Sequence, residues 1–120
     1  MPDTLDAADL TPLKQSTYRV LLALAEDEMH GYAIMQALSD MTDGRETILP
    51  GTLYAALARM VDDGLIEAVQ APEAESSGGP KRRHYRRTDF GRAVARAESE
   101  RLRALLEIAQ AQDILSGDSK

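Results

Sequence analysis

The sequence contains no cysteine and no tryptophan, and it has only one phenylalanine and four tyrosines in 120 residues. Without cysteine the chain can form no disulfide, no thiolate metal site and no cysteine nucleophile, which fits a reducing compartment. With so few aromatic rings, the core must be aliphatic. Because 43% of the residues are hydrophobic, we expect one globular domain with one modest core.

The chain also lacks a long hydrophobic run. No apolar stretch approaches the roughly 18 residues that a membrane-spanning helix needs. Residues Met1–Leu10 carry three Asp and no apolar run, which is unlike a secretory signal peptide. We therefore expect a soluble, cytoplasmic protein with no membrane partner.

Signals for catalysis are missing as well. The sequence has no Gly-rich phosphate loop after a strand, no cluster of metal ligands and no plausible Ser/His/acid set. Its two histidines, His30 and His84, lie far apart in the sequence and have no companion ligands at metal spacing. The sequence thus predicts no enzyme, no metal site and no cofactor.

The charge is unevenly distributed. The net charge of −6 argues against a nucleic-acid partner, but the local distribution decides that question. Within seven residues and with no acid among them lie five positive charges: Lys81, Arg82, Arg83, Arg86 and Arg87. This basic segment on an acidic chain indicates an anionic partner, with a merely solvated charge run as the alternative.

Apolar spacing predicts three short helices in the first part of the chain. The first begins at Thr11-Pro12, a favourable cap and first helical residue, and runs to about Ala25. The second runs from about Tyr32 to Met41. The third opens at Pro50 and ends at Asp63-Gly64, where Gly64 suits a left-handed C-terminal cap.

A β-hairpin and a long helix follow. Two strand-like runs, 65–71 and 83–88, flank residues 72–80, which are rich in Pro, Ser and Gly and read as a flexible loop. Thr88 then caps an amphipathic helix over 89–115. The order predicts a mainly α fold with a small β-hairpin, a winged helix-turn-helix domain with a long C-terminal helix.

The expected domain organisation follows from this order. Residues 1–10 form a flexible acidic N-terminus and residues 11–88 form the winged helix-turn-helix domain. Residues 89–115 form a C-terminal dimerisation helix, and residues 116–120 form a flexible tail.

Four motifs occur in an order and spacing that resemble the PadR-like transcriptional regulators, in particular the short members with a single C-terminal helix. They span most of the chain, from about Leu21 to Arg92. The motifs are Met29-His30-Gly31-Tyr32-Ala33-Ile34, Pro50-Gly51-Thr52-Leu53-Tyr54, Asp63-Gly64-Leu65-Ile66, and Arg82-Arg83-His84-Tyr85-Arg86 leading to Thr88-Asp89-Phe90-Gly91-Arg92.

The resemblance implies a homodimeric regulator, often a repressor, that binds inverted repeats of the ATGT…ACAT type near promoters. It also implies a small-molecule effector, since members of the family often respond to small aromatic or drug-like molecules. The chain departs from the family pattern at two places. Arg87 stands where relatives usually carry Leu or Ile, so it either packs inward or contacts DNA. The third helix offers Ala55, Ala56 and Ala58 where a polar or basic side chain is frequent.

The third helix is the expected recognition helix. With Leu53, Leu57 and Met60 buried, its opposite face presents Thr52, Ala55 and Arg59, with Tyr54 to one side. Thr52 can reach a phosphate or base edge, Arg59 a guanine or a phosphate, and small Ala residues allow approach to thymine methyl groups. The alternative is that Pro-Gly-Thr only caps the helix and that Tyr54 is a core residue.

The predicted hairpin is the second DNA contact. Side chains alternate along a strand, so with Tyr85 facing inward, His84 and Arg86 face outward. We expect Lys81, Arg82 and Arg86 to contact phosphates. Tyr32 could contact a phosphate from the start of the second helix, although a purely local role for His30-Gly31-Tyr32 is the alternative.

The last helix has too many apolar residues for a solvated surface helix. We expect it to pair with a second copy of the chain, with the first helix as a co-partner. The apolar residues assigned to this interface are Leu102, Leu105, Leu106, Ile108 and Leu115. The competing function is a winged helix that binds another protein instead of DNA, which the net charge of −6 keeps open.

Overall fold

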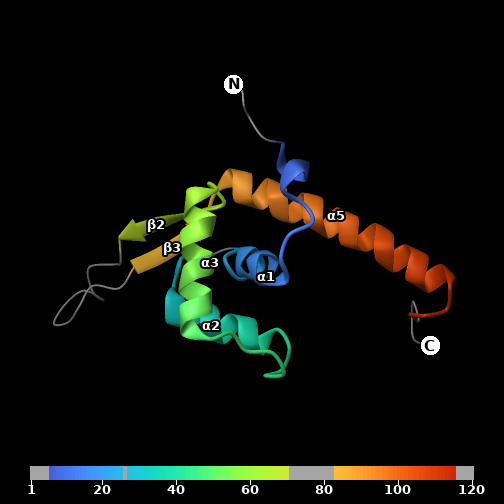
Figure 1. The fold of residues 1–120 in the computed structure, drawn as a ribbon, viewed down its shortest axis with the longest axis horizontal. Coiled ribbons are helices and arrows are strands. Elements are labelled where there is room, and N and C mark those ends of the chain that lie inside the picture. The colour runs from blue at the N-terminus through green and yellow to red at the C-terminus, as the bar shows by residue number, and fades with distance from the viewer. Residues whose placement is uncertain (1–5, 26, 71–82, 116–120) are drawn as a thin grey trace.

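The computed structural model describes residues 6–25, 27–70 and 83–115. The short helices and the sheet gather around the first half of the last helix, whose second half extends beyond them (Figure 1). In chain order the elements are η1 (Ala7–Leu10), α1 (Gln15–Ala23), β1 (Met29–His30), α2 (Gly31–Asp40), α3 (Pro50–Asp62), β2 (Ile66–Gln70), β3 (Arg83–Arg87) and α5 (Asp89–Ala111).

The core is aliphatic, as the composition predicts. α1, α2 and α3 contribute buried residues spaced three and four apart, because such residues share one face of a helix, and α5 contributes Val94 and Ala95 from its first half. Tyr85 is the one aromatic ring in this cluster. The buried hydrophobic residues are Val20, Leu21, Leu24, Ile34, Leu38, Leu53, Leu57, Met60, Leu65, Ile66, Tyr85, Val94 and Ala95.

The sheet has three antiparallel strands in the order β1-β3-β2. Tyr85 at the centre of β3 stands opposite Met29 of β1 on one side and Ala68 of β2 on the other. The predicted hairpin is therefore present as β2 and β3, while the predicted loop over 72–80 lies outside the described residues. Strand β1 was not predicted, because two residues are too few to show a strand periodicity.

The start of the first helix and the N-terminal segment before it differ from the prediction. The first helix begins at Gln15 and not at Thr11-Pro12, and its N-cap is Lys14, which makes no capping hydrogen bond through its side chain. The loose N-terminus predicted for 1–10 is wrong for 7–10, since η1 packs against α5 through residues that touch the core, Ala7 and Leu10. Local composition could not show this contact, because its partner, α5, lies far along the chain.

The last helix also ends earlier than predicted. α5 stops at Ala111, and Asp113 then adopts a left-handed φ of 61°. A short polar side chain tolerates this conformation better than most residues do. The apolar residues Ile114 and Leu115 therefore follow the helix and do not belong to it.

Hydrogen bonds and close packing hold the joint between the hairpin and α5 in place. The Thr88 hydroxyl accepts a hydrogen bond from the Gly91 amide at 2.9 Å and donates one to the Gly64 carbonyl at 2.6 Å. Gly64 has a φ of +79°, as expected for a left-handed helix cap. Gly91 lies directly against the Leu65 carbonyl, so a methyl group there would overlap with backbone. In the part of the chain that the structure describes, no helix is long and apolar enough to cross a membrane.

Candidate nucleic-acid interface

Helix α3 presents an exposed face with a single charge. Its buried side consists of Leu53, Leu57 and Met60, as predicted. Thr52, Ala55 and Arg59 lie exposed on the opposite side. Residues 47–61 contain no Asp or Glu, although the chain carries 20 of them. An acid-free, exposed helix face on an acidic protein suits a negatively charged partner.

The start of α3 has no capping side chain. Leu49 is the N-cap residue in an extended conformation, and its side chain cannot accept a hydrogen bond. Pro50 takes the first helical position, where its missing N–H costs nothing. Thr52 is the third helical residue, so of the Pro-Gly-Thr segment considered as a helix cap it is Pro50 that stands at the helix start. The first amides of a helix have no acceptor within the helix, which makes this end able to bind a phosphate or a base edge.

Gly51 has no structural partner that requires a glycine. A methyl group at Gly51 would meet no atom within 4 Å, and its φ is not in the left-handed region. The absence of a side chain here leaves the surface of the helix start open to close approach from outside.

Tyr54 links α3 to the start of α2. Its ring lies against Gly31, where an added methyl group would overlap with the ring carbons and the hydroxyl. Tyr54 is nevertheless 48% exposed, so it both packs between the two helices and faces solvent. The two readings of Tyr54, core aromatic and surface residue, are therefore compatible.

The start of α2 forms a hollow next to Tyr54. His30 is the N-cap of α2, and its Nδ1 accepts a hydrogen bond from the Ala33 amide at 3.2 Å. The local role considered for His30 is thus present. Tyr32 points its ring outward and is 61% exposed. The hollow encloses about 350 Å³ and is lined by His30, Gly31, Tyr32, Tyr54 and Arg83.

His84 is buried, contrary to the prediction that it faces outward. It is only 5% exposed, and its ring meets the ring of His30 edge-on at 5.6 Å between centroids. The reason is the unpredicted strand β1, which pairs with β3 and brings His30 opposite His84. Simple inside-outside alternation fails for the middle strand of a small sheet, because both of its faces can be covered.

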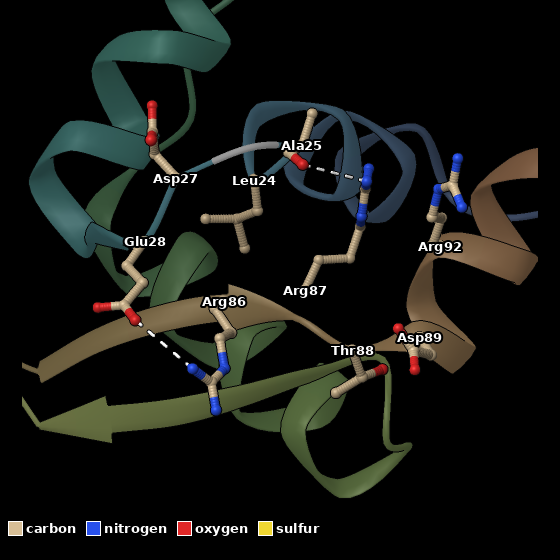
Figure 2. Close-up of a pocket in the computed structure, with 9 residues that line it drawn as sticks. All are labelled: Leu24, Ala25, Asp27, Glu28, Arg86, Arg87, Thr88, Asp89 and Arg92. Atoms are coloured by element: carbon tan, nitrogen blue, oxygen red, sulfur yellow. Dashed lines mark hydrogen bonds and ion pairs between the residues drawn. The ribbon is translucent and has the colours of Figure 1, made fainter.

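Arg86 lies on the exposed side of β3, as predicted, but it is paired with acids. Its Nε donates a hydrogen bond to Glu67 on β2 at 2.7 Å. Its Nη1 lies 3.6 Å from Glu28, just before β1 (Figure 2). The hydrogen bond and the charge of Glu67 raise the pKa of Arg86. A phosphate would have to compete with these two carboxylates for the guanidinium.

Arg87 packs inward, which answers a question that the sequence leaves open. Its guanidinium donates to the Leu21 carbonyl at 3.1 Å. It also donates to the Ala25 carbonyl at 3.2 Å (Figure 2). It therefore caps the C-terminal end of α1, where carbonyl groups lack partners and a positive charge is favoured. A charged residue of β3 thus caps a helix end.

A charge-balanced hollow surrounds Arg87. It encloses about 330 Å³ at the junction of α1, β3 and α5 (Figure 2). Its three arginines face three acids, so it has no excess charge to select an ion. The lining residues are Leu24, Ala25, Asp27, Glu28, Arg86, Arg87, Thr88, Asp89 and Arg92.

The second half of α5 is uncovered. Leu105, Leu106 and Ile108 are each just over half exposed, and Leu115 is 40% exposed. Leu102 is half-buried within the single chain. Four of the five residues assigned to dimerisation thus form apolar surface that the described part of the chain leaves exposed.

A buried carboxylate in the first half of α5 was not anticipated. Glu98 is 2% exposed; it accepts hydrogen bonds from Arg101 at 2.7 and 3.0 Å and from the Leu13 amide at 3.3 Å. The hydrogen bonds from Arg101 lower the pKa of Glu98. The i,i+3 spacing of Glu98 and Arg101 is visible in the sequence, but the contact with Leu13 is not.

Two sites expected on the hairpin, Lys81 and Arg82, lie outside the described residues. Within 6–25, 27–70 and 83–115, no group of three or more potential His, Asp or Glu ligands could hold a metal ion. Tyr32, Thr52, Tyr54, Arg59 and Arg86 are exposed. Tyr32 and Tyr54 are brought together at the start of α2, whereas Arg86 lies within its own ion-pair cluster.

Known structures share this fold. A transcriptional regulator from Clostridium thermocellum superposes with a TM-score of 0.67 at 25% identity, covering 80% of this chain and 87% of that one. A PadR family regulator from Clostridium difficile gives 0.68 at 22% identity, covering 82% and 97%. Bacillus subtilis PadR in complex with operator DNA gives 0.60 at 20% identity, covering 76% and 48%. The winged-helix fold class is confirmed.

Comparison of the sequence with known proteins also finds transcriptional regulators. The transcriptional regulator Rv3488 of Mycobacterium tuberculosis is 39% identical over 100 residues, which cover 83% of this chain and 82% of that protein. A model described as the transcriptional regulator PadR-like family matches residues 20–97. Since this match spans more than half of the chain and describes regulators and not enzymes, the chain is no enzyme and belongs to the PadR-like family of transcriptional regulators.

Proposed function

We propose that this protein regulates transcription by binding duplex DNA sequence-specifically as a homodimer, most simply as a repressor at an inverted repeat near a promoter. The observation that carries the proposal is the exposed face of α3, which has no acid from residue 47 to 61 on a chain of net charge −6. Bacillus subtilis PadR, which shares the fold, has been crystallised with its operator. Because the proposed partner is promoter DNA, we place the action of the protein in the cytoplasm.

In this proposal α3 enters the major groove. Thr52 contacts a phosphate or base edge, and Ala55 lets the helix lie close to the bases. Arg59 lies on the exposed face one turn beyond Ala55 and two turns beyond Thr52, and it binds a guanine edge or a phosphate. The hydroxyls of Tyr32 and Tyr54 contact the phosphate backbone from the hollow at the start of α2.

The hairpin supplies further phosphate contacts through Lys81, Arg82 and Arg86. The contribution of Arg86 is smaller than that of an unpaired arginine, because Glu67 and Glu28 already partly neutralise it. The main effect of Arg86 is to hold the strands together through its ion pairs. An approaching phosphate replaces Glu28, the more distant of the two acids, as a partner of the guanidinium.

The exposed apolar half of α5 supports the homodimer. Pairing two copies through this surface would place two α3 helices on one side of the duplex, about 34 Å apart, as a palindromic site requires. A small-molecule effector that releases the repressor fits the family, and titration calorimetry with phenolic acids and cationic drugs tests for it. Flat traces throughout would place regulation elsewhere.

The test is fluorescence anisotropy with a duplex that covers the promoter of the protein's own gene, repeated across salt concentrations. We expect a specific complex whose affinity falls with salt, with a log–log slope of about −0.9 for each phosphate neutralised. Arg59→Ala should reduce both affinity and slope. Arg96→Ala, the same charge change at an exposed position in the first half of α5, should leave both unchanged.

The competing function is a winged helix that binds a protein, which the net charge of −6 keeps open. It predicts no specific DNA complex and no salt-dependent affinity for the duplex. An Arg59→Ala variant that binds the promoter as tightly as the wild type would contradict the assignment of α3 as the recognition helix.

A further inference from the structure

Leu49 is a large apolar side chain exposed at the start of α3. It is 73% exposed, compared with 48% for Tyr54 and 42% for Met41. It lies at the end of α3 that is next to α2 (Figure 1). Within the described residues Leu49 is not part of the core cluster or of the hydrophobic residues packed against it.

The fold itself gains nothing from a leucine at this position. Leu49 is the N-cap of α3, a position at which Ser, Thr, Asp and Asn are favoured because their oxygens bind free amides. A leucine forgoes that hydrogen bond and also leaves apolar surface in water. Both effects are unfavourable in the free protein, so a partner that covers Leu49 is the simplest reason for its presence.

The position of Leu49 identifies the partner. It directly precedes the first turn of α3, three residues before Thr52, and its side chain is exposed, as are those of Thr52, Ala55 and Arg59. It also lies within the acid-free stretch 47–61. Charge complementarity and continuity with the proposed recognition face both favour duplex DNA as the occupant.

We infer that Leu49 determines sequence preference by packing against thymine methyl groups in the major groove. The thymine C5-methyl is the apolar group that the major groove displays, and it marks the orientation of an A·T pair. Leu49 at the helix start, together with Thr52 and Ala55 on the exposed face of α3, then reads methyl groups, and Arg59 contributes the charge. This inference rests on the proposed DNA binding.

The experiment begins with a duplex that the protein itself selects from a random library. That duplex is resynthesised with single dT→dU replacements, which remove one methyl group and leave base pairing intact. Binding is measured for the wild type, Leu49→Ala and Leu49→Ser. Leu49→Ser restores a capping oxygen, so it should raise the Tm and separate loss of contact from loss of folding.

We expect one or two dT→dU positions to weaken binding of the wild type by about fourfold each, the effect of losing one buried methyl group. Leu49→Ala and Leu49→Ser should weaken binding to the thymine duplex at least as much as one dT→dU replacement weakens binding of the wild type. They should be insensitive to the same dT→dU replacements, because the partner of the methyl group is gone. Met41→Ser, an exposed apolar residue at the end of α2, should retain the wild-type pattern.

Three results would overturn the inference. In the first, Leu49→Ser binds the thymine duplex as the wild type does. In the second, its loss is equal on thymine and uracil duplexes. In the third, Leu49→Ser changes only self-association in sedimentation, which would make a second copy the occupant of this surface. A selection that enriches no duplex at all would contradict the proposed DNA binding itself. This failure is distinct from the three results above, because each of those requires a wild-type protein that binds a selected duplex.

Discussion

At the scale of single residues, three glycines of this chain serve different purposes. Gly91 is needed for packing, since a methyl group there would overlap with the Leu65 carbonyl. Gly31 makes room for the ring of Tyr54. Gly51 has open space around it and an ordinary φ. The first two glycines are explained by the fold of the chain, and Gly51 is best explained by its proposed partner.

Gly51→Ala should therefore separate stability from function. Because alanine has a better helix propensity and restricts the unfolded chain, the free energy of unfolding should rise by about 0.5–1 kcal/mol. Affinity for DNA should fall, because the added methyl group lies where the duplex approaches the start of α3. Chemical denaturation and anisotropy on the same preparation measure both. A variant that is more stable and binds equally well would mean that DNA does not approach Gly51.

Arg87 illustrates what a residue type alone cannot reveal. The sequence shows a charge where relatives usually have an apolar residue, and this charge could point inward or toward DNA. The choice depended on the C-terminal end of α1, which lies more than 60 residues earlier in the chain and offers two unpaired carbonyls to the guanidinium. A long flexible side chain takes the nearest strong acceptors, and only the tertiary structure specifies where they are.

At the scale of elements, the segment before α1 is joined to α5 by a buried carboxylate. Glu98 accepts hydrogen bonds from the Leu13 amide and from Arg101. Its pKa is lowered mainly by the hydrogen bonds from Arg101. A carboxyl group whose pKa is lower in the folded than in the unfolded state stabilises the fold above its unfolded pKa. That stabilisation is lost as the pH falls through the folded pKa.

Glu98→Gln tests this joint. At pH 7 the variant should melt about 5 °C or more below the wild type, because a charge-assisted pair in a buried place is replaced by a neutral amide. The difference should narrow as the pH falls below about 4, where the wild-type carboxyl group also becomes protonated. Melting curves by circular dichroism between pH 3 and 7 measure it. A difference that is independent of pH would mean that the charge of Glu98 does not stabilise the joint.

The exposed half of α5 carries the second prediction at this scale. Leu106→Glu should convert a dimer into a monomer, since a charge is placed in the centre of the apolar surface. Gln110→Glu makes the same charge change at an exposed polar position of the same helix and serves as the control. Sedimentation velocity at micromolar concentration distinguishes the two. Equal sedimentation of Leu106→Glu and the wild type would remove α5 from the interface.

At the scale of the whole molecule, the proposed function depends on two copies acting together. Each copy offers one α3 helix and one hairpin, so a duplex with one half-site should bind much more weakly than a duplex with two. In the Leu106→Glu variant the two duplexes should bind alike, because the copies then bind independently. Titration of both duplexes with both proteins measures this. A wild-type protein that binds both duplexes equally would show that one copy suffices.

The charge of the molecule also matters only through its distribution. A net charge of −6 opposes approach to DNA at long range, yet the face of α3 carries no acid, and charges beyond about 10 Å are screened at moderate salt. Four exposed predicted contacts, Tyr32, Thr52, Tyr54 and Arg59, come from α2 and α3. The recognition face is therefore set by which helix sides are buried, and the acids lie elsewhere.

The sequence by itself determined the features that depend on neighbours in the chain. Helical periodicity placed the buried stripes of α3, and Thr88 and Gly64 marked the ends of elements, because capping and turn formation act over three or four residues. Four motifs in order identified the family. Only the tertiary structure decided the burial of His84 beside β1, the inward turn of Arg87 and the packing of η1 on α5. These contacts join residues tens of positions apart, and their partners follow from packing in space and not from any local pattern.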